Sequence, residues 1–254
     1  MRPKILFDSQ TVHMYAHLGR EFDNDSGGTK IYPEEKDFRL KTFFAIVEEY
    51  GEILISNNKI DPNLLSNVDL FVILTRMSKY YSSELDSIFS FVKNGGSLLL
   101  MSNHDPVCQW DAEVAEKFGV VLEGGYWSGI RGKSTEISKE NFTDHPILAQ
   151  TNPPIGSIVT NTTCRIVSEK GNIIVYLPDT MVEGIDKNPI EPKNIFGLEL
   201  NSNYSNQIGG KIVILADSGF LGEQGSRFPG LGLIEEGDNL AFIKNILEYL
   251  VSVD

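Results

Sequence analysis

The chain has 254 residues, with 22 Lys and Arg against 35 Asp and Glu, so its formal net charge is −13. Its length suits one large domain or two small ones, and its 41% hydrophobic and 22% charged residues exclude a disordered or fibrous protein. The negative excess, without any Lys or Arg run longer than two residues, argues against nucleic acid or an anionic membrane surface as the main partner, since both are repelled.

Targeting signals and disulfides are not indicated. No apolar run reaches the roughly 7–15 residues of a signal peptide or the roughly 20 residues of a membrane span. Cys108 and Cys164 are too few for a disulfide framework and fit a reducing compartment. We therefore predict a cytoplasmic protein without a membrane partner.

Strands and helices alternate through the N-terminal half. Continuous apolar runs predict strands, and apolar residues at helical spacing predict helices between them. The expected strands span 4–8, 52–56, 69–75, 97–101 and 120–122, and the expected helices run from about 33 to 50, 82 to 94 and 109 to 118. Residues 9–33 have no periodicity and predict a long loop. The alternation indicates a flavodoxin-like α/β fold with a doubly wound, mostly parallel sheet.

The segment from about 123 to 206 departs from this pattern. It is rich in Gly, Pro, Asn and Thr, and its short apolar runs predict antiparallel edge strands. Residues 164–167 and 173–176 predict a hairpin, and 196–200 is expected to pair with 211–216. A final helix is expected from Asp238, which is a good N-cap. The chain is therefore interpreted as one domain, residues 1–254, with a β-rich insertion at about 123–206.

Several segments of this layout match a known superfamily. They are Ile5–Asp8, Tyr81–Leu85, Phe91–Leu100, His145–Ile147, Ile212–Ser218 and Gly237–Asn239. The chain thus resembles the class I glutamine amidotransferase-like superfamily, especially its non-amidotransferase branches: the trehalose-utilisation-type proteins and the related domain of intraflagellar transport proteins. The resemblance spans nearly the whole chain and implies the fold more strongly than any chemistry.

The amidotransferase nucleophile is missing. An active member of the superfamily would carry Gly-x-Cys-x-Gly after the strand at 97–101, where this chain reads Met-Ser-Asn-His-Asp-Pro over 101–106. Cys108 comes too late, beyond a proline, and no His-x-Glu pair follows. We therefore expect no release of ammonia through a thioester. His104 at this turn is similar to the trehalose-utilisation-type branch.

Polar residues follow several of the expected strands, among them Thr75 with Arg76. In an open α/β sheet, ligands bind at the carboxyl ends of the strands. His104 could act there as a general base with Asp8 and Asp217, and these three are the candidate catalytic residues. Neighbouring candidates for ligand binding are Ser102, Asn103, Asp105, Ser218 and Asn239. The alternative for each Asp is that it merely caps nearby backbone N–H groups.

Two further groups could contribute to a site. Trp127 and Arg131, in an expected loop, suit stacking on a sugar or a planar ligand, or Trp127 could close the edge of the core. His13 and His17, at i, i+4 spacing, could hold a divalent metal with Asp8 and His104. The Gly-rich stretches lack the spacing of a phosphate loop or a dinucleotide motif, so no cofactor is expected beyond that metal.

Three hypotheses follow for function. The first is a protein that binds a small polar, sugar-like ligand, with hydrolytic or acid/base chemistry at His104. The second is a non-catalytic module of amidotransferase-like fold that binds a partner protein. The third is a metal-dependent hydrolase. If the chain is an enzyme, the expected activity is hydrolase-like.

Overall fold

The computed structural model describes residues 2–8, 22–23, 28–29, 40–56, 59–76, 78–106, 108–129, 133–150, 153–183, 194–203, 208–222 and 233–252. Its main sheet runs in the order β12-β7-β10-β13-β14-β6-β5-β1-β4, and β11 also pairs with β13. The strands of this sheet are β1 (Lys4–Asp8), β4 (Glu52–Ser56), β5 (Leu70–Leu74), β6 (Ser97–Met101), β7 (Val121–Ser128), β10 (Thr162–Val167), β11 (Asn172–Tyr176), β12 (Val182–Glu183), β13 (Ile195–Leu200) and β14 (Ile212–Leu215).

The remaining elements surround this sheet. The helices are α1 (Lys41–Tyr50), α2 (Pro62–Leu65), α3 (Ser82–Lys93), α4 (Gln109–Lys117), α5 (Pro146–Ala149) and α6 (Asn239–Val251), with single 3₁₀ turns at Lys139–Asn141 and Gly219–Leu221. Two small ribbons pair β2 (Phe22–Asp23) with β3 (Gly28–Thr29) and β8 (Thr135–Ser138) with β9 (Ser157–Thr160).

Five parallel strands form the part of the sheet that the alternating sequence predicts. Their order is β4-β1-β5-β6-β14, which in order of appearance along the chain is 2-1-3-4-5. This is the flavodoxin-like order, in which the direction of winding reverses between the first and third strands, here β1 and β5. The predicted fold class is confirmed.

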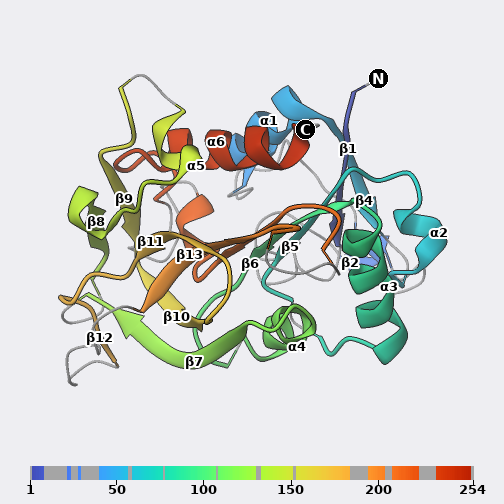
Figure 1. Ribbon diagram of the computed structural model, residues 1–254, viewed down its shortest axis with the longest axis horizontal. Coiled ribbons are helices and arrows are strands. Elements are labelled where there is room, and N and C mark those ends of the chain that lie inside the picture. The colour runs from blue at the N-terminus through green and yellow to red at the C-terminus, as the bar shows by residue number, and fades with distance from the viewer. Residues whose placement is uncertain are drawn as a thin grey trace.

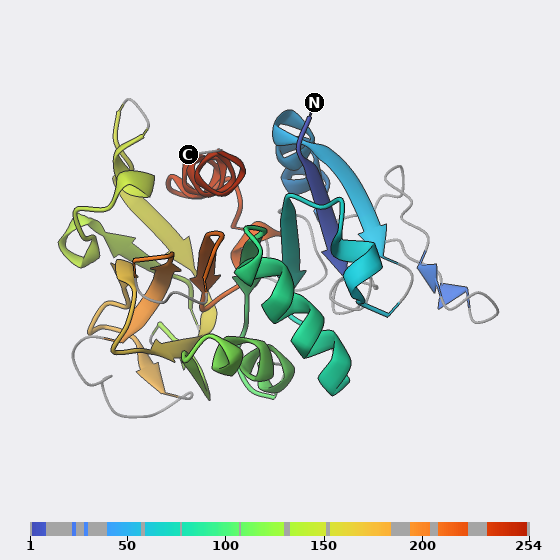
Figure 2. The ribbon, with the colours of Figure 1, turned by 45° about the vertical axis from the view of Figure 1, so that its right-hand side comes forward.

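Helices cover both faces of the parallel strands. Helices α1 and α6 pack together on one face, and α3 and α4 pack together on the other (Figures 1 and 2). Strand β5, Leu-Phe-Val-Ile-Leu, is completely buried, as its continuous apolar run predicts for a central strand. Helix α3 turns Ile88, Phe91 and Val92 toward the sheet at helical spacing. The core is thus contiguous through the three layers.

The antiparallel part of the sheet differs from its prediction in one pairing. Strand β13 pairs with β14 as expected, but β10 and β11 each pair with β13 and do not form the predicted hairpin. Strand β13 has hydrogen-bonded neighbours on both of its edges, and all six of its residues are buried. Strand β10 continues the sheet outward to β7 and β12, on the left in Figure 1.

Strand β7 is longer than predicted. It runs from Val121 to Ser128 through Gly124 and Gly125, so Trp127 lies in a strand and not in the expected loop. The two glycines were expected to end the strand. They lie instead where the register with β10 shifts, and the strand continues through them. The expected start of the first helix, near residue 33, lies outside the described residues.

Candidate functional site

The switch point between β1 and β5 is occupied by a buried ion pair. Asp8 ends β1, and Arg76 follows β5 after a single residue. The Arg76 guanidinium donates to Asp8 at 2.9 Å and lies 3.4 Å from a carboxylate oxygen of Glu84. The ring of Tyr80 lies 3.9 Å from the guanidinium carbon. We call Asp8, Arg76, Tyr80 and Glu84 the switch-point cluster.

The switch-point cluster is closed to solvent. The side chains of Arg76, Asp8 and Glu84 are 5%, 2% and 2% exposed. Burial by itself lowers the pKa of Arg76, but the charges of Asp8 and Glu84 outweigh it and the pKa is raised, so the guanidinium stays charged. Glu84 also accepts the N–H of Tyr81 and so closes the first turn of α3. This cluster therefore combines charge compensation with helix capping.

The backbone at Thr75 turns Arg76 into the cluster. Thr75 has a φ of +48°, which is uncommon for a β-branched residue. Its hydroxyl lies 2.7 Å from the hydroxyl of Ser218, after β14, and Asn103 Nδ2 donates to the same Ser218 oxygen at 3.3 Å. The ends of β5, β6 and β14 are thus joined by side-chain hydrogen bonds, in which predicted ligand residues Asn103 and Ser218 take part.

A third carboxyl group, that of Asp111, is buried close to the ends of these strands. Asp111 of α4 accepts the backbone N–H of Arg76 and the hydroxyl of Ser102, both at 3.0 Å. Burial raises the pKa of Asp111 to about 8, although these hydrogen bonds oppose the rise. Asp111 is therefore largely protonated at neutral pH, and the predicted ligand residue Ser102 is engaged inside the protein.

Asp217 and His104 lie close enough to interact electrostatically. Asp217 is 1% exposed and accepts the Thr160 hydroxyl and the Gly219 N–H, both at 2.6 Å. Burial raises its pKa to about 6, and these hydrogen bonds and the nearby charge of His104 partly oppose the rise. His104 is half-buried, and its Nδ1 lies 2.6 Å from the Asp105 carbonyl oxygen.

The turn after β6 contains no activated thiol. Cys108 is buried and donates its S–H to Asp105 at 3.2 Å. Burial and the Asp105 carboxylate raise the pKa of Cys108 to about 12, the opposite of what a nucleophilic cysteine requires. Asp105 is exposed, and its backbone N–H donates to the Gly125 carbonyl of β7.

The proposed catalytic residues therefore belong to two separate sets of contacts. Asp8 is bound to Arg76, whereas Asp217 is bound to Thr160 and lies near His104. Of the predicted site residues after β6 and β14, only His104 and Asp105 are more than one-tenth exposed in the described part of the chain.

The other predicted site residues have varied positions. Trp127 is 8% exposed, its indole lies 5.5 Å from the guanidinium carbon of Arg165, and its N–H has no hydrogen-bond partner among the described residues. Asn239 is fully buried and binds the backbone of Val159 and Leu233. Arg131, His13 and His17 lie outside the described residues.

The described residues contain no group of three or more His, Cys, Asp and Glu side chains able to hold a metal ion. No helix among them is long and apolar enough to cross a membrane.

Comparisons with known proteins bear on the fold. No protein-family model matches the sequence, and the search of curated proteins gives no match. Among solved structures, the mmIFT52 N-terminal domain is similar at a TM-score of 0.70, with 14% identity and 98% of both chains covered. A ThuA-like protein from Bacteroides uniformis has a TM-score of 0.57 and 14% identity, over 100% of this chain and 92% of that one. The cytoplasmic protein STM3548 from Salmonella typhimurium matches at 0.57 and 14%, over 98% of both.

These likenesses establish a shared fold. Both branches to which the sequence shows a resemblance have a counterpart among the neighbours, so the resemblance holds at the level of architecture.

Two residues of the site, Glu84 and Asp111, were not expected there from sequence, and Arg76 was expected at the carboxyl edge of the sheet without a role in the site. Arg76 carried a signal, because a charged residue directly after a predicted central strand must lie at the carboxyl edge of the sheet. Glu84 was visible only as a helix-capping residue. Asp111 gave no signal, since a carboxyl in the first turn of a helix is ordinarily solvated there.

Proposed function

We propose that this chain is a non-catalytic recognition module of amidotransferase-like fold, which binds a partner protein at the carboxyl edge of its sheet. The observation that carries the proposal is the switch-point cluster. Folds of this topology hold their ligand in the crevice at the switch point. Here Asp8, Arg76 and Glu84 occupy that position with compensated charges and almost no exposed surface.

The groups with catalytic potential support the same proposal. A general base must come within hydrogen-bond reach of its substrate. Asp217 is instead engaged with Thr160 and Gly219 beneath the surface, and Ser102 with Asp111. The nucleophile position of an amidotransferase is filled by this hydrogen-bonded turn, and the thiol of Cys108 is not ionised near neutral pH.

The turn at His104 and Asp105 is the proposed contact surface. It is held by the Asp105 N–H on Gly125, by the His104 N–H on Asn103 Oδ1 and by the Cys108 thiol on the Asp105 carboxylate. A turn already held in one conformation loses little conformational entropy on binding, which favours recognition of a protein surface.

Site-specific photo-crosslinking tests this surface. A photoreactive amino acid replaces the exposed Asp105, and a matched variant carries it at the exposed Glu248 on α6. In cells that express the chain, we expect a discrete protein adduct from position 105 and none from position 248. Adducts from neither position, or equal adducts from both, would overturn the proposed surface.

A hydrolase is the second candidate, because one observation favours it. Asp217 has its pKa raised to about 6 by burial and lies near His104, a combination found in acid/base pairs. Purified wild-type and His104→Ala proteins are to be compared on nitrophenyl esters and nitrophenyl glycosides. The recognition module predicts the same background rate for both proteins. A wild-type rate more than about tenfold above the variant would favour the hydrolase, since general base catalysis contributes at least 10²-fold.

A further inference from the structure

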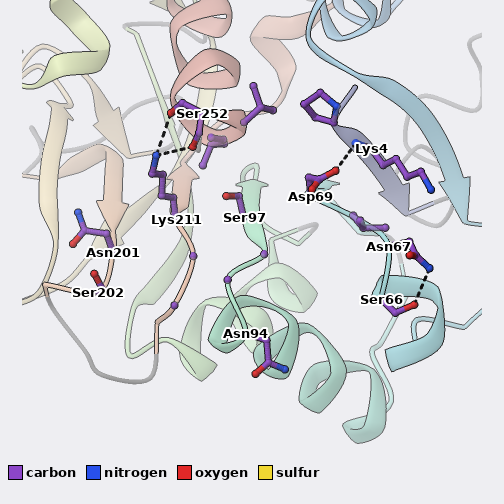
Figure 3. A pocket seen from close by; sticks show the side chains of 18 of the residues that line it. Lys4, Ser66, Asn67, Asp69, Asn94, Ser97, Asn201, Ser202, Lys211 and Ser252 are labelled. Carbon is purple, nitrogen blue, oxygen red and sulfur yellow. Dashed lines mark hydrogen bonds between the residues drawn. The ribbon is translucent and has the colours of Figure 1, made fainter. Parts of the chain in front are cut away.

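The two edges of the sheet differ in the exposure of their polar groups. At the amino-terminal edge, a groove of about 770 Å³ lies between the starts of β1, β6 and β14 and the end of α6 (Figure 3). None of its described lining residues has a buried polar side-chain atom without a hydrogen-bond partner, and Lys211 donates to the Ser252 carbonyl at 3.0 Å. At the carboxyl edge, by contrast, the side chain of Asp111 is fully buried. Water can reach this carboxyl group only if the surrounding segments move.

Asp111 closes the connection between β6 and α4. This connection begins at Ser102, carries His104 and Asp105, and ends in the first turn of α4. The Ser102 hydroxyl lies 3.0 Å from Asp111 Oδ2, so one hydrogen bond joins the two ends of the connection. Within it, the Cys108 N–H donates to the His104 carbonyl at 3.2 Å. Opening of the turn would therefore separate Ser102 from Asp111 and bring water to the buried carboxyl group.

The same carboxyl group also contacts the segment after β5. Its Oδ1 accepts the backbone N–H of Arg76 at 3.0 Å, while its Oδ2 is bound to Ser102. Both oxygens of Asp111 are thus occupied, and neither of these partners is a cation. We call the two hydrogen bonds of Asp111, to Arg76 and to Ser102, the Asp111 link. It holds together the chain segments that follow β5 and β6.

The charges around the Asp111 link favour a protonated Asp111. The guanidinium of Arg76 already faces the carboxylates of Asp8 and Glu84. An ionised Asp111 would add a third negative charge against this single positive charge in a region closed to solvent. Burying an uncompensated charge is costly, so the carboxyl group keeps its proton. In this form its O–H can donate to the Ser102 oxygen while the other oxygen accepts the Arg76 N–H.

Asp111 is the group of this region whose charge changes near neutral pH. Within the described part of the chain, the titratable groups that interact with it electrostatically are Asp8, Arg76, Tyr80, Cys108 and Cys164. Asp8 and Arg76 stay charged because they form a buried ion pair. Burial raises the pKa of Cys108 to about 12 and the pKa values of Tyr80 and Cys164 well above their ordinary values, so these three stay neutral.

We propose that the Asp111 link is a proton-dependent switch, which holds the turn at His104 and Asp105 closed and favours its opening when Asp111 loses its proton. The inference rests on the proposed function, because this turn is the proposed contact surface, and it adds regulation to that surface: binding of a partner to the closed turn weakens as the pH rises.

The direction of the pH effect follows from the environment of Asp111 in the two states. In the closed turn its pKa is about 8, whereas in the opened turn water returns the pKa toward the ordinary value of 3.8. The turn therefore releases a proton when it opens near neutral pH. Opening becomes about tenfold more favourable per unit of pH between about pH 5 and 7 and levels off above about pH 8.

Amide hydrogen exchange of the purified protein, measured by NMR between about pH 5 and 7, tests the switch without a partner. The reporters are the N–H of His104, bound to Asn103 Oδ1 at 2.8 Å, and the N–H of Asp105, bound to the Gly125 carbonyl at 3.0 Å. Their protection is the intrinsic exchange rate at each pH divided by the measured rate. We expect this protection to fall about tenfold per unit of pH in wild type, relative to Asp111→Asn.

Asp111→Asn is the matched variant because it imitates the protonated carboxyl group at every pH. Its amide can donate to Ser102 and accept from Arg76, so the link stays closed. Only the ratio of wild type to variant is used, since Asp217, with a pKa of about 6, and His104 are the same in both proteins. Ser102→Ala is a second variant, which breaks the link and should lower the protection of the turn about fivefold at pH 5, the effect of one hydrogen bond.

Two further sets of amides separate local opening from global unfolding. Amides of the central strand β5 should exchange by global unfolding and be more protected than the turn at every pH. The Ser252 N–H, bound to the Glu248 carbonyl at the end of α6, should exchange by local fraying and be equally protected in wild type and Asp111→Asn.

Three results would overturn the switch: turn amides as well protected as those of β5, a ratio of wild type to Asp111→Asn that does not change with pH, or unchanged protection of the turn in folded Ser102→Ala. Failure of photo-crosslinking from position 105, with the expected pH dependence of exchange intact, would instead overturn the proposed contact surface alone.

Discussion

The guanidinium of Arg76 lies 2.9 Å from the carboxylate of Asp8, and the two side chains are 5% and 2% exposed. The pair joins the ends of β1 and β5 at the position where the winding of the sheet reverses. A buried pair of this kind need not add net stability, because both ions lose their hydration. Its two members nevertheless depend on each other, since either alone would be an uncompensated buried charge.

Arg76→Met should therefore be strongly destabilising. The variant leaves Asp8 and Glu84 buried without their cation, and we expect the free energy of unfolding to fall by about 3–5 kcal/mol. Urea denaturation at pH 7 measures the change. Lys117→Met is the matched control, because it breaks the exposed pair with Asp86 and should cost less than about 1 kcal/mol. Similar losses in both variants would show that the buried pair matters no more to the free energy of unfolding than the exposed pair does.

The sequence predicts the strands that carry the site better than it predicts the contacts between the site's side chains. One strand ends at Asp8 and another ends two residues before Asp217, and both follow from apolar runs that stop at a carboxylate. The alternation of strands and helices places both carboxylates at one edge of the sheet. The ion pair of Asp8 with Arg76 and the hydrogen bond of Asp217 with Thr160 do not follow from the sequence, because each partner comes from a different element. Local patterns describe single elements, whereas these contacts depend on tertiary packing.

The β-rich segment was less predictable for the same reason. Glycines in β7 look like the end of a strand, although here Gly124 gives room to Asp105, whose carboxylate would lie 2.2 Å from a Cβ at that position. The choice of β13 as a common partner for β10 and β11 depends on distant strands competing for its edges. Turn chemistry between β10 and β11 therefore favours a hairpin that the complete sheet does not form.

Stability should decrease with increasing pH because Asp111 loses a proton that the folded state binds tightly. Its folded-state pKa of about 8 exceeds the ordinary value of 3.8, so the folded state binds the proton more tightly than the unfolded chain does. The contribution to stability is full below pH 3.8 and is lost as the pH rises through about 8. Asp111→Asn keeps a neutral group of similar shape. Between pH 5 and 7, wild type should lose about 1.4 kcal/mol per pH unit relative to this variant, and the loss per unit should fall to about half of that at pH 8.

Denaturation curves at pH 5, 6, 7 and 8 for both proteins check the prediction for Asp111. Only the difference between the two proteins is used, because other groups, including Asp217 with its pKa raised to about 6, titrate equally in both. Parallel dependence on pH would show that Asp111 does not bind the expected proton.

The thiols should resist alkylation in the folded protein. Burial raises the pKa of Cys164 well above its ordinary value, and burial together with the Asp105 carboxylate raises that of Cys108 to about 12. We expect no modification by iodoacetamide at pH 8 over an hour in the folded state and modification of both cysteines in urea, as counted by mass spectrometry. Rapid alkylation of native Cys108 would contradict its assigned environment and would revive a thiol mechanism.

Asn239 should act on stability and not on binding at the carboxyl edge. Its amide donates to the Val159 carbonyl at 2.8 Å and the Leu233 carbonyl at 2.7 Å, and its oxygen accepts the Val159 N–H at 2.9 Å. Asn239→Ala leaves these buried backbone groups without partners and should cost about 2–4 kcal/mol in urea denaturation. Asn239→Asp retains the acceptor but loses both donors and adds a buried charge, so it should be no more stable. The exposed Asn94→Ala should change stability by less than about 0.5 kcal/mol. If Asn239→Ala were as stable as Asn94→Ala, the contact between α6 and β9 would not depend on this amide.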